Sequence, residues 1–324
     1  MPRPKVVITD NDYPPATIEE EELEAVNAEV VWAQCKSPEE VLDLARDAHA
    51  IIVEYAPITR EVIAGLERCQ IISRYGIGVD NVAVEAATEK GIVVTNVPDY
   101  CLDEVADHTM ALLLALARKI TRLDRATKQG KWDVWSAAAP VYGLRDSSLG
   151  LIGFGQTARR AATRAQGFGM QVLAHDPWID EESFHEYDAT STSLDELLRL
   201  SDFVSLHTRL TDDTYHLIGE DELKRMKPHA FLINTARGDI VDERALFRAL
   251  TEGWIAGAAV DVLAQEPPPP DYQLVSLDNI IVTPHAAFYS ERSIQELRRR
   301  ATREVVRVLQ GLEPASPVNR RSSR

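Results

Sequence analysis

The chain has 324 residues and a mass of 36.1 kDa, which corresponds to about two domains of ordinary size. Apolar residues make up 45% of it and charged residues 27%, which is typical of globular proteins and excludes a chain that is disordered throughout. The 35 Lys and Arg against 51 Asp and Glu leave a formal charge of −16, which repels phosphate backbones and anionic lipids, so neither nucleic acid nor membrane is an expected partner.

The cysteines and the apolar segments indicate the compartment. Cys35, Cys69 and Cys101 are widely spaced and odd in number, which predicts neither a disulfide framework nor a metal site. The most apolar segment, TMALLLALA at residues 109–117, is about half the length that spans a bilayer, and the N-terminus does not resemble a signal peptide. We therefore expect a cytoplasmic protein without a bound metal.

Short β-rich runs alternate with helical patterns, which predicts βα units and parallel sheets. The first series has expected strands at residues 6–9, 30–32, 50–53, 71–73 and 92–95, with helices at 18–27 and 38–46. The acidic run at 19–22 is interpreted as a solvated helix face, in turns where the helix dipole favours carboxylates. A long helix is expected at 104–120 and an irregular segment at 130–148. The second series has expected strands at residues 149–153, 171–175, 203–206, 231–235, 257–262 and 280–283, and a last helix at 290–310.

A glycine-rich turn opens the second series. The sequence GFGQTA places Gly153 at a tight turn, Gly155 where the backbone can approach a pyrophosphate, and Ala158 where a helix packs closely on a strand. The following helix offers N–H groups to the phosphates. Asp176 follows the next strand, 21 residues after Gly155, where a carboxylate accepts ribose hydroxyls and repels a 2′-phosphate. The pattern predicts a Rossmann dinucleotide site that prefers NAD to NADP.

Three ionisable residues follow later strands of the same series: Arg237, Glu266 and His285. Ligands of open α/β sheets bind outside the carboxyl ends of the strands, so all three can converge beside the nicotinamide. Reduction of a 2-oxo acid needs a proton donor at the carbonyl oxygen, a cation that binds the substrate carboxylate, and a second carboxylate whose negative charge keeps the donor protonated. His, Arg and Glu fit these roles, although each residue taken singly has an ordinary structural alternative.

Five segments resemble the signatures of the D-isomer-specific 2-hydroxyacid dehydrogenases. They are RYGIGVDN (74–81), GIVVTNVPDY…EVADHTMALLLALAR (91–118), NTARGDIVDERAL (234–246), GAAVDVLAQEP (257–267) and TPHAAFYSE (283–291). The pairing of NVP…EVAD with PHAAFYSE is most similar to the branch that contains the C-terminal binding proteins and their bacterial enzyme relatives, although Phe288 stands where the animal proteins carry Trp.

The resemblance implies an α/β fold of two Rossmann-like, doubly wound domains with parallel sheets and a cleft between them. A discontinuous substrate-binding domain would comprise residues 1–99 and 288–324, and an NAD-binding domain residues 100–287. The implied activity is the reversible NAD(H)-linked interconversion of a D-2-hydroxy acid and its 2-oxo acid. A homodimer is expected, formed through the cofactor domain and the helix at 104–120.

The resemblance also implies a role for individual residues: His285 is the acid/base, Glu266 its partner and Arg237 the anchor of the substrate carboxylate. The expected cofactor-binding residues are Gly153, Phe154, Gly155, Gln156, Thr157, Asp176, Thr208, Thr235, Ala236, Arg237, Asp261 and His285. The expected substrate-binding residues are Arg74, Tyr75, Gly76, Ile77, Gly78, Tyr100, Arg237 and Phe288. Asp261 is either a second modulator of the histidine or a structural cap, and His108 is interpreted as structural.

Two alternatives to this function stay open. One is an NAD(H)-responsive binding protein of the C-terminal binding protein type, and the other is a dehydrogenase of phosphorylated hydroxy acids. The substrate side chain is open as well: Tyr75, Tyr100 and Phe288 predict an apolar or thioether group. Arg74 could instead reach a second carboxylate or a phosphate, or it could pair with an acid near Asp99.

Overall fold

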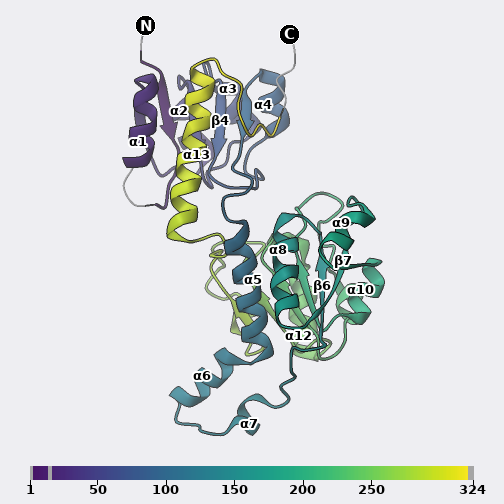
Figure 1. The fold of residues 1–324 in the computed structure, drawn as a ribbon. Helices are drawn as coiled ribbons and strands as arrows, with labels where there is room; N and C mark the ends of the chain where they lie inside the picture. Colours follow the sequence, from purple (N-terminus) through teal and green to yellow (C-terminus); the bar gives the residue numbers. More distant parts are fainter. Residues whose placement is uncertain (1–2, 14–16, 320–324) are drawn as a thin grey trace. The chain divides into compact units, whose positions relative to one another are not determined.

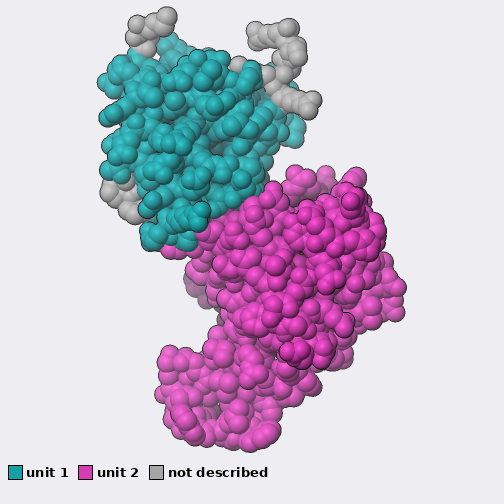
Figure 2. Space-filling model, viewed as in Figure 1, with its two compact units in different colours: residues 1–100, 290–324 teal, residues 101–289 magenta. Residues whose placement is uncertain are grey.

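The computed structural model describes residues 3–13 and 17–319, and the chain divides into two compact units. Unit 1 lies within residues 1–100 and 290–324, and unit 2 spans residues 101–289 (Figure 2). Each unit contains its own parallel sheet covered by helices on both faces (Figure 1). The predicted α/β fold with two Rossmann-like parallel sheets is confirmed.

Unit 1 has a five-stranded sheet in the order β2-β1-β3-β4-β5, and every pairing in it is parallel. Its strands and helices are β1 (Lys5–Ile8), α1 (Thr17–Leu23), β2 (Glu29–Trp32), α2 (Pro38–Ala45), β3 (Ala50–Val53), α3 (Arg60–Gly65), β4 (Ile71–Arg74), α4 (Val84–Lys90), β5 (Val93–Thr95) and α13 (Glu291–Leu309). Helices α2, α3 and α4 cover one face of the sheet, and α1 and α13 cover the other. Both faces are therefore buried, which is why these strands are apolar without alternation.

The acidic run at residues 19–22 is not solvated along its whole length, as the sequence had suggested. Glu19 of α1 is fully buried, and its carboxylate accepts hydrogen bonds from both Nε and Nη2 of Arg298 on α13, at 2.8 and 2.7 Å. The Tyr75 hydroxyl donates to the same carboxylate at 2.8 Å. A local charge pattern cannot reveal this burial, because Arg298 lies 279 residues away in the chain.

Unit 2 has a seven-stranded parallel sheet in the order β12-β11-β10-β9-β6-β7-β8. Its strands are β6 (Ser148–Ile152), β7 (Gln171–His175), β8 (Thr190–Ser191), β9 (Phe203–Leu206), β10 (Phe231–Asn234), β11 (Gly257–Val260) and β12 (Ile280–Val282). Its helices are α5 (Leu102–Ala117), α6 (Ile120–Lys128), α7 (Val134–Ala138), α8 (Gln156–Gly167), α9 (Glu181–Glu186), α10 (Leu194–Leu200), α11 (Glu220–Arg225) and α12 (Glu243–Glu252). The strand order reverses at β6, and the gap between the ends of β6 and β9 is the switch point where such sheets bind ligands.

The long helix expected at residues 104–120 is α5 (Leu102–Ala117), whose ends lie two to three residues earlier, and a second helix follows it. Helix α5 ends at Ala117, and Lys119 adopts a left-handed conformation with φ of 52° before α6 begins. The sequence contains no Gly or Pro at this point that would predict the break. The apolar residues of α5 pack on α8 and the sheet within unit 2, and none of the described helices has the length and hydropathy of a membrane span. The segment predicted as irregular also contains the short helix α7.

We predict that the buried pair Glu19–Arg298 is a major determinant of the stability of unit 1. Replacing Arg298 with Met leaves the Glu19 carboxylate buried without its cation, so the free energy of unfolding in urea should fall by about 3–5 kcal/mol. The matched control is Arg303→Met, because Arg303 pairs with Glu22 at 2.9 Å on the same helix but is 57% exposed. The control should cost no more than about 1 kcal/mol, and equal losses for the two variants would contradict the prediction.

Candidate active site

The glycine-rich turn connects β6 to α8 at the switch point of unit 2. Gly153 has φ of +85°, and a Cβ atom there would lie 2.8 Å from the backbone of His207 and Thr208. Only glycine fits this backbone and this close approach. Gly155 is different, because nothing lies within 4 Å of its notional Cβ, and it begins α8 without a side-chain cap. The open space above Gly155 and the uncapped helix N-terminus suit a pyrophosphate.

Asp176 lies directly after β7, beside this turn. Its Oδ2 accepts a hydrogen bond from the Phe154 N–H at 2.8 Å, and its Oδ1 accepts one from the Trp178 N–H at 3.0 Å. These two bonds fix the carboxylate in place while leaving it further lone pairs for ribose hydroxyls. The position is the one that the sequence spacing predicted.

Two residues near Asp176, Arg159 and Trp178, were not identified as candidate site residues from the sequence. Arg159 donates from Nε to the Phe154 carbonyl at 3.0 Å, and its guanidinium lies 5.3 Å from the centre of the Tyr187 ring. Trp178 is 90% exposed, although it is the largest kind of apolar side chain. An aromatic residue directly after a strand-end Asp-Pro is the signal that could have singled out Trp178.

His207 is a further residue that the sequence interpretation missed. It follows β9, its backbone limits the space at Gly153, and its Nε2 lies 2.9 Å from the Ser205 hydroxyl. Burial of the imidazole lowers the pKa of His207 to about 4, so the ring is neutral at physiological pH. It therefore adds no positive charge at the switch point between the ends of β6 and β9.

The three predicted catalytic residues follow three adjacent strands: Arg237 follows β10, Glu266 follows β11 and His285 follows β12. His285 Nδ1 lies 2.7 Å from Glu266 Oε2, and Glu266 Oε1 accepts the Leu263 N–H at 2.8 Å. Burial alone would raise the pKa of Glu266, but its hydrogen bond to His285, the charge of His285 and the Leu263 N–H together lower it below the usual value. The carboxylate is thus ionised at neutral pH, and an ionised carboxylate can only accept, so His285 Nδ1 carries the hydrogen of this bond.

The backbone of Arg237 is held at the turn after β10. Asn234 at the end of β10 donates from its side-chain amide to the Arg237 carbonyl at 2.8 Å and accepts the Ala236 N–H at 3.0 Å. The neighbouring Thr235 hydroxyl lies 3.0 Å from that of Thr109 on α5. These bonds define the turn after β10 that also contains the predicted cofactor contacts Thr235 and Ala236.

Asp261 is buried beneath the loop that carries His285. Its carboxylate accepts the N–H groups of Ala286 and Ala287 at 2.9 and 2.8 Å and the hydroxyl of Thr283, while its carbonyl accepts the His285 N–H at 2.7 Å. Burial would raise the pKa of Asp261, and hydrogen bonds, including one from His108, outweigh it and lower the pKa. Because Asp261 is 1% exposed and its oxygens are already bonded, the structure favours the capping role over direct contact with a cofactor.

His108 of α5 completes this support. Its Nε2 lies 3.1 Å from the Thr283 hydroxyl and 3.5 Å from Asp261 Oδ1. The contact explains how a helix residue interpreted as structural reaches the loop of residues 283–287. Among the described residues, no group of three His, Cys, Asp or Glu side chains is arranged to hold a metal ion.

Unit 1 carries the remaining predicted substrate residues at the end of β4. Gly76 has φ of +146°, and a Cβ atom there would collide with Nη1 of Arg74, so the guanidinium packs directly on the glycine backbone. Arg74 Nε is buried and has no hydrogen-bond partner among the described residues. The alternative in which Arg74 pairs with an acid near Asp99 gains no support, because Asp99 itself pairs with Arg300 at 2.7 Å.

The Tyr75 ring does not face a ligand site, contrary to the expectation of an aromatic pocket. It is 1% exposed, packs edge-on against Tyr13 at 6.0 Å, and bonds to Glu19. Arg74 and Tyr75 are consecutive on an extended backbone, so their side chains point to opposite sides, and the buried side takes the aromatic ring. Tyr100 packs partly buried against the same core, whereas Phe288 of unit 2 contacts the His285 ring edge-on at 6.0 Å.

Comparison with known proteins gives a consistent result. Residues 110–287 match the family model of the D-isomer specific 2-hydroxyacid dehydrogenase, NAD binding domain. The chain is 40% identical over 282 residues to a glyoxylate reductase of Korarchaeum cryptofilum, covering 86% of this chain and 85% of that protein. It is 38% identical over 318 residues to a D-3-phosphoglycerate dehydrogenase of Methanocaldococcus jannaschii, covering 97% of this chain and 59% of that protein. Among solved structures, the D-lactate dehydrogenase of Aquifex aeolicus in complex with NAD and lactic acid superposes with a TM-score of 0.86 at 30% identity, covering 94% of this chain and 96% of that one.

Proposed function

The chain belongs to the D-isomer specific 2-hydroxyacid dehydrogenase family, and we propose that His285, Glu266 and Arg237 perform its reaction. It is an NAD-dependent oxidoreductase that interconverts a D-2-hydroxy acid and the corresponding 2-oxo acid. The observation that carries the residue assignment is the 2.7 Å contact between His285 and Glu266 at the ends of adjacent strands, with Arg237 after the next strand.

His285 exchanges the proton in this proposal. Its Nδ1 is engaged by Glu266, so Nε2 is the nitrogen that faces the substrate oxygen. The imidazolium donates a proton to the carbonyl oxygen when the 2-oxo acid is reduced, and the neutral ring takes it back when the hydroxy acid is oxidised. Glu266 orients the ring and stabilises its charged form, while Arg237 binds the substrate carboxylate with a guanidinium suited to that planar group. NAD, when bound, supplies the hydride acceptor.

Unit 2 holds the cofactor in this proposal. The contacts we assign to it are Gly153, Phe154, Gly155, Gln156, Thr157, Asp176, Thr208, Thr235 and Ala236. The cradle at Gly153, the uncapped N-terminus of α8 and the fixed Asp176 carboxylate fit a dinucleotide. The charge of Asp176 disfavours a 2′-phosphate, which supports NAD over NADP. The exposed indole of Trp178, two residues further on, would offer the adenine a stacking surface.

Unit 1 contributes to substrate recognition through Arg74 and residues 76–78 in this proposal. Burial of the Tyr75 ring removes one of the three aromatic residues on which an apolar side-chain pocket rested. Asp99 is committed to Arg300, and Arg74 Nε has no hydrogen-bond partner among the described residues. We therefore propose a substrate with a second anionic group that Arg74 binds. One relative, a D-3-phosphoglycerate dehydrogenase, is named for such a substrate, whereas the glyoxylate reductases among the relatives are not. Placement in the branch of the C-terminal binding proteins stays a prediction, and the three free thiols favour a cytoplasmic location.

The acid/base assignment predicts a shift in the pH dependence of Glu266→Gln. Reduction needs the imidazolium and therefore declines as rising pH removes its proton, whereas oxidation improves. Because the lowered pKa of Glu266 keeps it anionic at neutral pH, its removal takes away the charge that stabilises the imidazolium, so kcat/KM for reduction should begin to decline at a lower pH. His285→Gln should lose about 10²–10⁴-fold in turnover.

The matched control is Glu252→Gln on the exposed surface of unit 2, which should leave the pH profile unchanged. An unshifted profile in Glu266→Gln, or near-native turnover in His285→Gln, would show that the proton comes from another group.

The role of Arg74 predicts a specific change in substrate preference. Specificity constants should be measured for pyruvate, 4-methylthio-2-oxobutyrate, 2-oxoglutarate and 3-phosphohydroxypyruvate. A dianionic substrate should win by more than tenfold in the native protein, and Arg74→Ala should abolish that advantage because the second anion loses its cation. Arg300→Ala, which removes a nearby arginine already paired with Asp99, should keep it. Preference for the thioether substrate in both native protein and Arg74→Ala would instead support an apolar pocket.

We also propose a homodimer, with an interface other than the one expected from the sequence. The apolar residues of α5 are buried within unit 2, whereas Trp132 is 91% and Trp135 80% exposed on the segment of α6 and α7 that extends from the body of that unit (Figure 1). Exposed aromatic surface of this kind is typical of interaction sites.

Sedimentation velocity at micromolar concentration should therefore show a dimer of the 36.1 kDa chain. The double variant Trp132→Ser/Trp135→Ser should sediment as a monomer, since it removes the apolar contact area. Trp178→Ser is the control, because Trp178 is 90% exposed elsewhere on unit 2 and should leave the dimer intact. A native protein that sediments only as a monomer would refute the proposal.

A further inference from the structure

The segment that carries Glu266 is attached to helix α12 by one carboxylate. Glu243, the first residue of α12, accepts the Ala264 N–H at Oε1 at 2.9 Å and the Tyr272 hydroxyl at Oε2. Ala264 and Tyr272 lie on either side of Glu266 in the sequence, so this carboxylate holds the chain after β11 at two points. The prolines at 267–270 between them have no backbone N–H groups with which to hold the segment themselves.

The same segment is fixed from a second side by Gly238, which directly follows Arg237. A Cβ atom at Gly238 would overlap the carbonyl carbon of Leu263 and the nitrogen of Ala264. Glycine lets the turn after β10 pack directly on this peptide, because it has no side chain that would separate the two backbones. The turn that carries Arg237 and the segment that carries Glu266 are therefore in direct backbone contact.

Leu263 in turn orients the Glu266 side chain. The Leu263 N–H donates to Glu266 Oε1 at 2.8 Å, and Glu266 Oε2 lies 2.7 Å from His285 Nδ1. The Glu266 side chain is 34% exposed, so its direction is set by these hydrogen bonds more than by packing. A shift of residues 263 and 264 would therefore move the carboxylate that His285 meets.

Glu243 occupies an unfavourable place for a carboxylate. It is half-buried, and burial raises its pKa. The Ala264 N–H lowers the pKa, the charges of Asp239 and Glu266 raise it, and His216 lowers it. The helix dipole favours an acid in the first turn of α12, but that interaction is equally available to an exposed side chain. The hydrogen bonds to the segment after β11 are what compensate the burial of this group.

We propose that Glu243 is a positioning residue for the pair of Glu266 and His285. It fixes residues 263–266 from the side of α12, so that the Glu266 carboxylate stays within hydrogen-bond distance of the imidazole. Glu243 itself touches neither substrate nor cofactor. The inference rests on the proposed roles of Glu266 and His285, and it adds the group on which their alignment depends.

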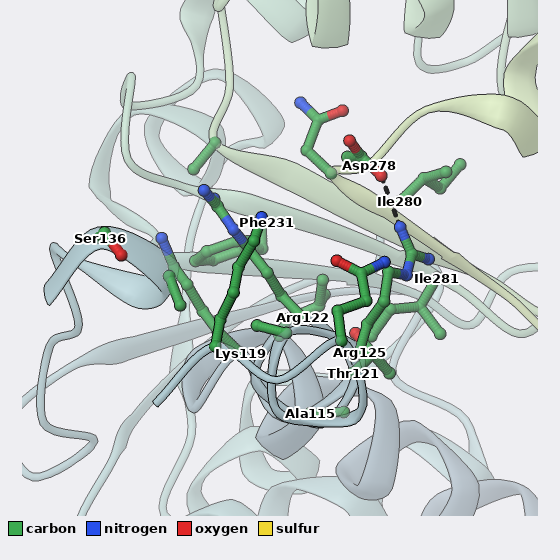
Figure 3. Close-up of a pocket in the computed structure, with 17 residues that line it drawn as sticks. Ala115, Lys119, Thr121, Arg122, Arg125, Ser136, Phe231, Asp278, Ile280 and Ile281 are labelled. Carbon is green, nitrogen blue, oxygen red and sulfur yellow. Dashed lines mark hydrogen bonds and ion pairs between the residues drawn. The ribbon is translucent and has the colours of Figure 1, made fainter. Parts of the chain in front are cut away.

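This support is separate from the cavity of about 550 Å³ that Figure 3 shows. Phe231 and Ile280, which line the cavity, are the first residues of β10 and β12, whereas the segment with Glu266 follows the carboxyl end of β11. Residues of α6 and α7 also line the cavity, and they belong to the segment that we propose as the interface between two copies. Variants of Glu243 should therefore leave the sedimentation of the protein unchanged.

The test is the pH dependence of kcat/KM for reduction of the preferred 2-oxo acid by NADH, measured on the full-length protein. Glu243→Ala removes both hydrogen bonds, so kcat should fall by about tenfold or more. The decline with rising pH should begin at a lower pH, as in Glu266→Gln, because the imidazolium loses a well-placed anion. The KM for NADH should stay within about twofold of the native value. A general loss of folded protein would instead lower the rate equally at every pH.

Conservative variants separate the hydrogen bonds from the charge. In Glu243→Gln the amide oxygen can still accept the Ala264 N–H and the amide nitrogen can donate to the Tyr272 oxygen, so rate and profile should stay near native. Tyr272→Phe removes one bond, and it should give a smaller shift in the same direction even if Glu243→Ala does not fold. The control is Glu252→Ala at the other end of α12, because Glu252 bonds to Trp254 instead, and it should behave as native.

The double variant Glu243→Ala/Glu266→Gln shows whether Glu243 acts through Glu266. Its pH profile should match that of Glu266→Gln alone, since no carboxylate is left to position. A native profile in both Glu243→Ala and Tyr272→Phe would overturn the inference, provided that Glu266→Gln shifts. Equal shifts in Glu243→Gln and Glu243→Ala would also overturn it, because the charge would then act on His285 directly. An unshifted Glu266→Gln is a different result, which contradicts the proposed function itself.

Discussion

The buried carboxylate of Asp261 holds the backbone of the loop that carries His285, on which the proposed chemistry depends. It collects the N–H groups of Ala286 and Ala287 and the Thr283 hydroxyl, and His285 sits between these residues with φ of 50°, in the left-handed region. That conformation is uncommon for a non-glycine residue, and here the hydrogen bonds of the loop to Asp261 hold it. A buried carboxylate without donors would be costly, so the charge and the loop stabilise each other. Glu266 can therefore bond to a histidine whose backbone is already held in place by Asp261.

The parallel sheet supplies the second constraint. Because β10, β11 and β12 are neighbours and run in the same direction, the residues after them emerge at one edge. The three residues Arg237, Glu266 and His285 are far apart in the sequence. Short segments after neighbouring strands are nevertheless enough to bring them to the same edge of the sheet. The switch point at β6 places the glycine turn at the same edge.

The chain is acidic as a whole, but individual cations still lie at the sites proposed to bind anions. Many cations pair with acids, as Arg303 does with Glu22 and Arg164 with Asp107, whereas the proposed substrate site uses only Arg237 after β10 and Arg74 on the Gly76 backbone. Local groups dominate such sites because screening confines exposed charges to about 8–10 Å at physiological salt. An acidic chain can thus act on anionic substrates without a basic surface.

The sequence by itself determined the features that depend on neighbours along the chain. Apolar runs bounded by turn residues located the strands at residues 50–53, 171–175 and 203–206 with the bounds that the structure has. The spacing from Gly155 to Asp176 predicted that the carboxylate would lie beside the glycine turn, because one helix and one strand separate them. The sequence also predicted that Arg237, Glu266 and His285 follow successive strands, because each lies a few residues after an apolar run.

Only the tertiary structure decided the features that depend on distant partners. Glu19 is buried because Arg298 and Tyr75 meet it across the core of unit 1, and Asp99 is committed to Arg300, so neither charge could be interpreted from its own segment. The left-handed residue Lys119 separates α5 from α6, although the sequence has no Gly or Pro at this point. Asp261 acts on the loop of His285 through hydrogen bonds that form only once β11 and β12 lie side by side. Periodicity and spacing record which side chains share a face, whereas ion pairs, caps and cavities are set by which faces pack together.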